Sequence, residues 1–186
     1  MIKMVTAIPK NLATEFRKNG VIWHNTMPQL NDRFIEETKR FMMENTGYND
    51  YPVACMSKIR GQDVAIQAAA DGLADYIPVR ANESIIFELA MPKDAIVSID
   101  YNELLRINSE ISLASDKEDL QYVVEELYSA LVVGMQEVDD VVSFVSGLAL
   151  SRCKFFTVLD NDFNVADFEF PGVEQVKLNN LNTFRR

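Results

Sequence analysis

The stretch Ser84-Ile85-Ile86-Phe87-Glu88-Leu89-Ala90-Met91 carries the clearest structural signal in the chain. Its apolar side chains recur with a two-residue period, which predicts a β-strand. The turn Pro92-Lys93-Asp94 connects it to a β-branched run at residues 95–100, so we expect the two strands to form a hairpin. Glu88 is the one charged residue of the first strand. It lies either on a solvent-exposed face or beside a partner such as an arginine, because burying an unpaired carboxylate is costly.

The segments on either side of this expected hairpin alternate between strand and helix patterns. Further strands are expected at residues 3–8, 51–59, 154–159, 166–170 and 173–178. Helices are expected at residues 9–19, 31–47, 62–76, 101–107, 115–131 and 139–148. Hairpins and clustered helices are not typical of a regular doubly wound sheet. We therefore predict a single α+β domain over residues 1–186, with about six helices packed on one or more mixed or antiparallel sheets.

Two of the expected helices have recognisable ends. Asn31 or Asp32 can cap the helix at residues 31–47, and Gly47 can close it. Ser115 and Glu118 have the spacing of a capping box for the helix at residues 115–131. This helix also has the strongest helical periodicity. Its apolar face is expected either to pack in the core or to pair with a second copy of the chain. Its apolar stripe consists of Leu120, Val123, Val124, Leu127 and Leu131.

Length and composition indicate a folded, soluble chain. Of its 186 residues, 48% are hydrophobic and 25% are charged, and a chain of this length buries roughly 70% of its unfolded surface in one core. The low glycine and proline contents exclude collagen-like and disordered classes. Cys55 and Cys153 cannot form a disulfide framework. With no export signal and no window of ~20 apolar residues, the chain is expected in the reducing cytoplasm.

The net charge of −10 is concentrated in one part of the sequence. Residues 83–140 hold 14 acidic and 3 basic residues, whereas the rest of the chain is nearly neutral. An acidic surface repels phosphate backbones, which argues against direct nucleic-acid binding. The acidic stretch is therefore either a solvated helix face or a surface for a partner. Such a surface would dock a basic protein, or imitate the charge of DNA to occupy a DNA-binding protein.

Established catalytic and cofactor motifs are not found in the sequence. His24 is the only histidine and is accompanied by no Gly-x-Ser-x-Gly elbow; with two distant cysteines it is a poor source of zinc ligands. Neither the Walker nor the Rossmann glycine pattern is present. Arg60 and Arg80 lie near expected strand ends, where arginines can bind a carboxylate or phosphate or simply serve as surface bases. The motifs thus predict no metal and no cofactor.

Short segments over nearly the whole chain resemble an uncharacterised domain family of bacteria and phages. Members typically open with Trp-Thr-Ile-Gln, a helix and a glycine-hydrophobic turn, to which Val5-Thr6-Ala7-Ile8 and Asn19-Gly20-Val21-Ile22 are similar. The family's Leu-Glu-x-x-Val-Pro and Leu-Ser-Asp patterns are similar to residues 85–92 and 97–100. The resemblance continues at residues 34–43, 51–53, 153–159 and 173–184. It implies a bacterial or phage protein.

The order of elements also resembles the compact mono-ADP-ribosyltransferase layout, through a threonine-bearing strand, a helix, a glycine and the later Glu88-Leu89-Ala90-Met91-Pro92. Such enzymes hold NAD in a cleft between two small sheets and place an Arg or His, a Ser or Tyr, and a Glu on separate strands. The resemblance puts Thr6 at the position of the first of these groups and Glu169 or Glu174 at that of the late acid. The run His24-Asn25-Thr26 has a similar His-x-Thr spelling.

Two hypotheses of function follow from the sequence. The first is a small acidic protein that needs no cofactor and binds and modulates, or inhibits, a macromolecular partner with a basic surface. Its candidate contact residues are Glu125, Glu126, Asp139 and Asp140. The second is an ADP-ribosyltransferase-like enzyme or a nucleotide-binding module that uses NAD or a related nucleotide. Its candidate pocket residues are Thr6, His24, Tyr51, Arg60 and Glu88.

Overall fold

A computed structural model describes residues 1–12, 15, 18–64, 72–80 and 83–147, together with the backbone of residues 153–157 and 174–175. The nine strands in this part of the chain form one sheet in the order β6-β5-β7-β2-β1-β4-β8-β9, with β3 paired to β2. Neighbouring strands are antiparallel, except for the parallel pair β8 and β9. The strands are β1 (Ile2–Pro9), β2 (Pro52–Ile59), β3 (Gln62–Asp63), β4 (Ser84–Met91), β5 (Ile96–Asp100), β6 (Val132–Val133), β7 (Val141–Ser146), β8 (Cys153–Thr157) and β9 (Glu174–Gln175).

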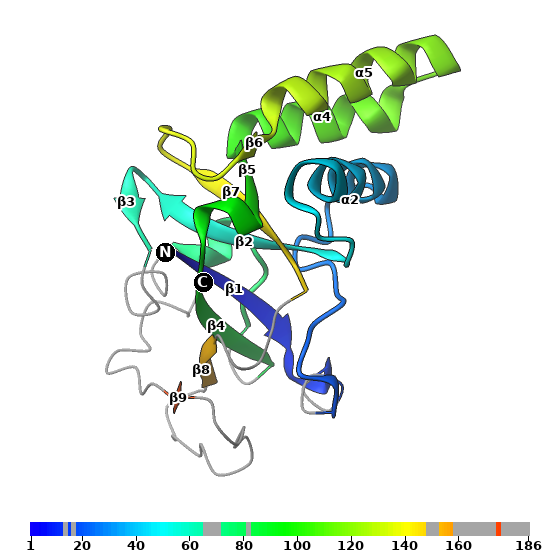
Figure 1. Ribbon diagram of the computed structural model, residues 1–186. Helices are drawn as coiled ribbons and strands as arrows, with labels where there is room; N and C mark the ends of the chain where they lie inside the picture. Colours follow the sequence, from blue (N-terminus) through cyan, green and yellow to red (C-terminus); the bar gives the residue numbers. More distant parts are fainter. Residues whose placement is uncertain are drawn as a thin grey trace.

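The described residues contain three α-helices, α2 (Asp32–Thr46), α4 (Tyr101–Leu113) and α5 (Lys117–Ala130). They gather on one side of the sheet, and α4 and α5 lie side by side (Figure 1). Three 3₁₀ turns, η1 (Lys10–Leu12), η2 (Leu73–Asp75) and η3 (Lys93–Ala95), connect other elements. The α+β class is therefore confirmed, but the expectation of about six helices is wrong. No helix in these ranges is long and apolar enough to cross a membrane.

Two segments expected to be helical contain strand residues. The expected helix at residues 62–76 begins as β3, because Arg60 and Gly61 adopt positive φ angles of 50° and 74° and reverse the chain after β2. Its far end is η2, and residues 65–71 lie outside the described part. The expected helix at residues 139–148 contains β7, whose first five side chains are all buried. A largely apolar run rich in β-branched valines suits a strand covered on both faces.

The expected hairpin of β4 and β5 is also wrong, although both strands exist. In the sheet they are separated by β1, β2 and β7, which in a flat sheet would place them about 19 Å apart. The connection from Met91 to Ile96 spans at most ~17 Å when fully extended, and η3 shortens it. The sheet must therefore curl so that the end of β4 approaches the start of β5. Consistent with this, Met91, Ala95 and Ile96 belong to one core cluster.

Both faces of the curled sheet bury side chains. On the face covered by the helices, Phe34 of α2 packs with Phe144 of β7, their ring centroids 6.3 Å apart, and with residues of α4 and α5. On the other face, Met4 of β1, Phe87 of β4 and Val145 of β7 share a second cluster. The sheet therefore has a hydrophobic core on each of its two faces.

The helix ends follow the sequence signals with one correction. Asn31 caps α2 by accepting from the Arg33 N–H at 2.8 Å, and Gly47 closes the helix at a φ of 78°. The prediction that Ser115 caps α5 is wrong, because Asp116 caps this helix by accepting from the Asp119 N–H at 2.9 Å. The stripe predicted for α5 does pack in the core, where Val123, Leu127 and Leu131 are buried. Helix α4 extends beyond the expected residues 101–107 to Leu113.

The ends of the chain are described in part. The expected helix at residues 9–19 starts as η1, and residues 13, 14, 16 and 17 lie outside the described part. Of the three strands expected after residue 153, two correspond to β8 and β9, whereas residues 166–170 also lie outside it. β8 extends the sheet beyond β4, opposite the edge formed by β6.

Candidate functional site

The sheet splits between β1 and β2. β1 pairs with β4 along its whole length, but with β2 only where Val5 faces Met56. Beyond that point the Ala54 carbonyl of β2 accepts from two hydroxyl groups, Thr6 Oγ1 at 2.8 Å and Thr26 Oγ1 at 2.6 Å. A carbonyl that would bond β1 in a continuous ladder is thus satisfied by side chains. The Thr26 hydroxyl thus anchors the segment before α2 to β2.

A cleft of about 600 Å³ lies beside the end of β1, within the size range of small-molecule sites. Its wall comes from three stretches of sequence: the end of β1 with η1, the segment before α2, and the segment that leads into β4. The described residues that line it are Ala7, Pro9, Lys10, Asn11, His24, Asn25, Thr26, Pro28, Pro78, Arg80, Glu83 and Ser84.

One rim of the cleft carries its charged groups. The Lys10 N–H donates to the Glu83 carbonyl at 2.8 Å, which joins η1 to the turn before β4. That turn is closed by the Ser84 N–H, which donates to the Arg80 carbonyl at 3.0 Å, and by Ser84 Oγ, which accepts from the Arg80 N–H at 2.9 Å. The Arg80 guanidinium lies 3.7 Å from the Glu83 carboxylate. Backbone bonds therefore bring Lys10, Arg80 and Glu83 together.

The opposite rim is uncharged and rigid. Asn25 Oδ1 accepts from the Met27 N–H at 3.0 Å, and Thr26 is tied to β2 by its bond to Ala54. Pro28 follows directly, and proline fixes the backbone φ angle. Gln29 Nε2 donates to the Tyr76 carbonyl at 3.4 Å, which links this rim to the segment that contains Pro78. The cleft is therefore formed by segments that are already held in place.

The electrostatics of the cleft differ from those of the whole protein. Among the described residues that line it, Lys10 and Arg80 outnumber the carboxylate of Glu83, although the chain has a net charge of −10. Burial lowers the pKa of His24 below its usual value, and the Glu15 carboxylate opposes this shift only in part. His24 is therefore neutral at pH 7, with one ring nitrogen as donor and the other as acceptor. The cleft offers cations to an anion and neutral polar groups beside them.

The five residues of the predicted nucleotide pocket do not line one cavity. His24 lines the cleft, and Thr6 lies buried beside it, bonded to Ala54. Arg60 is at the β2–β3 turn, where it pairs with Asp75 at 2.8 Å. Tyr51 precedes β2 and packs against both core clusters. Burial raises its pKa, and the negative charge of Asp32 adds to this shift. Glu88 is buried in the middle of β4, where its backbone is in register with Val5 and Lys154.

Sequence reasoning missed most of the residues that line the cleft. Arg80 was singled out as a base near a strand end, but Lys10, Asn25 and Glu83 were not. Lys10 directly follows β1 and Glu83 directly precedes β4, so the pairing of Pro9 with Ser84 places them side by side. A prediction that β1 and β4 are neighbours would have found them.

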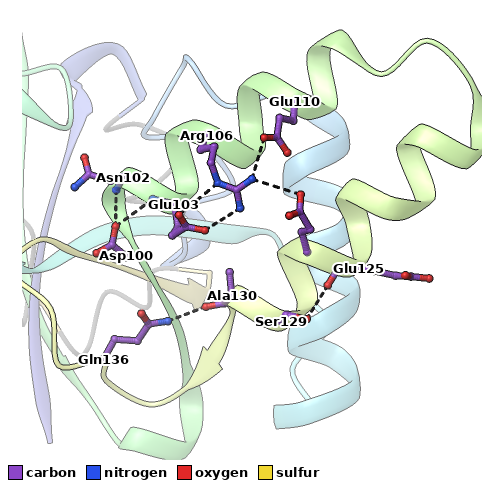
Figure 2. A network of polar contacts seen from close by, with 10 residues as sticks. Asp100, Asn102, Glu103, Arg106, Glu110, Glu125, Ser129, Ala130 and Gln136 are labelled. Carbon is purple, nitrogen blue, oxygen red and sulfur yellow. Dashed lines mark hydrogen bonds and ion pairs between the residues drawn. The ribbon is translucent and has the colours of Figure 1, made fainter.

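The candidate partner surface divides into two places. Glu125 and Glu126 lie on α5, beside a shallow open groove between α4 and α5 that also includes Glu103, Arg106 and Tyr122. In this groove Arg106 binds Glu103 and Glu110 at 2.9 Å, as Figure 2 shows, and Glu126 at 3.4 Å. The Tyr122 side chain is 64% exposed. A single arginine thus orders several carboxylates around an exposed aromatic ring.

Asp139 and Asp140 lie elsewhere, in the loop before β7. Asp140 Oδ1 accepts from the Arg60 N–H and from Tyr76 Oη, both at 2.7 Å. The Asp139 carbonyl accepts from the Gly61 N–H at 2.8 Å. This loop therefore holds the β2–β3 turn in place, and the Asp140 carboxylate has a role within the fold.

Comparison of the chain with protein-family models, with curated proteins and with solved structures finds no match. The functional interpretation therefore depends on the cleft and on the groove between α4 and α5.

Proposed function

We propose that this protein binds a small anionic ligand in the cleft formed by the end of β1, the segment before α2 and the segment that leads into β4. The observation that carries this proposal is that two cationic residues, Lys10 and Arg80, lie on one rim of a cleft of about 600 Å³ in an acidic protein. Arginine and lysine bind phosphates and carboxylates through charge-assisted hydrogen bonds. The cleft is large enough for a ligand of nucleotide size.

The fixed geometry of the rims supports this proposal. Binding costs less free energy when the contacting groups are already ordered. Backbone hydrogen bonds hold Lys10 beside Glu83, and Thr26 is anchored to β2. The Arg80 guanidinium lies as far as 3.7 Å from the Glu83 carboxylate, and both side chains are exposed. An anionic ligand therefore competes with a weak ion pair. At Arg80 the ligand therefore replaces a long ion pair between two exposed side chains.

The first test measures ligand affinity in charge variants of the rim. Pyrophosphate, ribose 5-phosphate, mononucleotides and NAD serve as probes in a thermal-shift screen, followed by calorimetric titration of those that stabilise the protein. A ligand that binds only the folded state raises the melting temperature. We expect Arg80→Ala and Lys10→Ala each to weaken binding about five- to twentyfold, since each removes one charge-assisted contact.

The matched control for these variants is Lys3→Ala. Lys3 is an exposed lysine of the same strand, β1, at the end remote from Pro9 and the cleft. Its removal changes the net charge equally and should leave the affinity unchanged. Equal weakening in all three variants would show a nonspecific charge effect, and the absence of stabilisation by every probe would refute the proposal.

As a second candidate function, we propose that the groove between α4 and α5 docks a basic protein partner. It is supported by the exposed Tyr122 ring among Glu103, Glu125 and Glu126. Aromatic anchors with surrounding charges are typical of protein interfaces. Arg106 holds the neighbouring carboxylates in fixed positions, which reduces the entropy lost on binding. By occupying the basic surface of the partner, this protein would modulate the partner's activity.

Charge reversal on α5 tests the second candidate. We expect Glu125→Lys with Glu126→Lys to abolish the salt-sensitive binding of a lysine- and leucine-containing amphipathic peptide, measured by fluorescence anisotropy of a labelled peptide. Complementary charges are the source of that binding. Glu36→Lys with Glu44→Lys, at exposed positions of α2, makes the same change in net charge away from the groove. Equal loss of binding in both double variants would contradict a specific surface on α5.

A further inference from the structure

The polar groups of the cleft are distributed unequally between its two rims. The charged groups, Lys10, Arg80 and Glu83, belong to the β1–β4 side. The groups on the other side, His24 and Asn25, are neutral and belong to a segment anchored on β2 through Thr26. A ligand that satisfies both rims therefore has an anionic end and an uncharged polar end.

The neutral rim has unused hydrogen-bonding capacity. Asn25 Oδ1 is occupied by the Met27 N–H, which leaves the two Nδ2 hydrogens as donors. No acceptor for Nδ2 is found among the described residues. His24 adds one donor and one acceptor, because burial lowers the pKa of its ring. A flat heterocycle with carbonyl and ring-nitrogen acceptors and amino donors, such as a nucleobase, matches these groups.

An exposed aromatic ring adjoins the neutral rim. Trp23, the only tryptophan of the chain, is 57% exposed and precedes His24 directly. Trp23 does not line the cleft itself. With Ile8, Leu12 and Glu15 it lines a small separate hollow, which shares His24 with the cleft. Aromatic side chains provide stacking surfaces for bases. Trp23 also reports on this rim, because its fluorescence is the only tryptophan emission of the protein.

We propose that the ligand of the cleft is a mononucleotide, with its phosphate at Lys10 and Arg80 and its base at His24 and Asn25. This inference rests on the proposed function as an anion-binding cleft and adds the polarity and chemical class of the ligand. The phosphate competes with Glu83 for Arg80, and the base accepts from Asn25 Nδ2.

The test compares ligands that differ only in the base. Trp23 fluorescence is titrated with the four common ribonucleoside monophosphates and with ribose 5-phosphate, which has the same anion without a base. We expect the best nucleotide to bind at least about tenfold more tightly than ribose 5-phosphate, the effect of one or two added hydrogen bonds with stacking.

Asn25→Asp is the informative variant. It keeps the oxygen that accepts from Met27 and removes the two Nδ2 donors, so the turn is retained. We expect the ratio of nucleotide to ribose 5-phosphate affinity to fall at least about fivefold, while ribose 5-phosphate itself reports the effect of the added charge. Asn49→Ala, at an exposed position before β2, is the control and should leave the ratio unchanged.

The outcomes separate the two proposals. Equal affinities for nucleotides and ribose 5-phosphate in the wild-type protein would overturn the mononucleotide assignment and leave the anion-binding cleft in place. An unchanged affinity ratio in Asn25→Asp would overturn the placement of the base. Failure of every phosphate-bearing probe to bind would overturn both proposals.

Discussion

Phe34→Ala is expected to lower the free energy of unfolding by about 3–5 kcal/mol, because it leaves a large cavity in the core. The Phe34 ring is fully buried at the first turn of α2 and packs against Phe144 of β7. It joins the helical layer to the centre of the sheet. Since small domains are stable by roughly 5–15 kcal/mol, the variant would be unfolded at much lower urea concentrations. Urea denaturation followed by circular dichroism measures the difference.

The control for Phe34→Ala is Met43→Ala on the same helix. The Met43 side chain is 43% exposed, so its truncation should change stability by no more than about 0.5 kcal/mol. Similar losses in the two variants would contradict the packing of α2 on β7 through Phe34.

Asp140→Ala is expected to lower the free energy of unfolding by about 2–3 kcal/mol. Its carboxylate accepts from both the Arg60 N–H and Tyr76 Oη. A hydrogen bond to a charged group stabilises a protein by roughly 1.5–3 kcal/mol, and water can replace most of the exposed contact with Arg60 in the variant. Arg60 also has a φ of 50°, which is strained for a residue with a side chain. Loss of Asp140 removes the bond that holds this turn. The measurement is again urea denaturation.

Two observations check the cause of this loss. Burial, the hydrogen bond to Asp140 and the Asp140 charge together raise the pKa of Tyr76 to about 12, so the variant should titrate closer to 10. Ultraviolet absorbance during a pH titration detects this shift. Asp139→Ala removes the same charge one residue away but keeps the backbone carbonyl that accepts from Gly61. It should change stability by no more than about 0.5 kcal/mol, and a loss equal to that of Asp140→Ala would refute the specific role of Asp140.

The result for Asp140 bears on the candidate partner surface. Of the four acidic residues predicted for it, Glu125 and Glu126 lie on the groove between α4 and α5, whereas Asp140 bonds within the fold. Sequence alone treats these carboxylates as equivalent, because their charge is the same. Their neighbours in three dimensions distinguish a surface group from a structural one.

Local sequence patterns determined the elements that have clear periods or caps. The alternation at residues 84–91 predicted β4, and Asn31 with Gly47 marked the ends of α2. The acidic stretch was also visible before folding, since charge is a property of composition. These features depend on residues within a few positions of one another, where spacing controls which side chains share a face.

The tertiary structure alone decided which strands are neighbours and where the cleft lies. Val141–Ser146 is apolar except at Ser143 and Ser146, a pattern that does not separate a helix from a strand; pairing with β2 and β5 makes it a strand. β4 and β5 are consecutive in sequence, yet strand pairing places three strands between them, and the curl of the sheet brings their connected ends together. The cleft lies where the end of β1, the segment before α2 and the segment that leads into β4 meet, and it brings Lys10, Asn25 and Arg80 together. Such contacts depend on pairing energies between distant segments, which the sequence of any one segment does not contain.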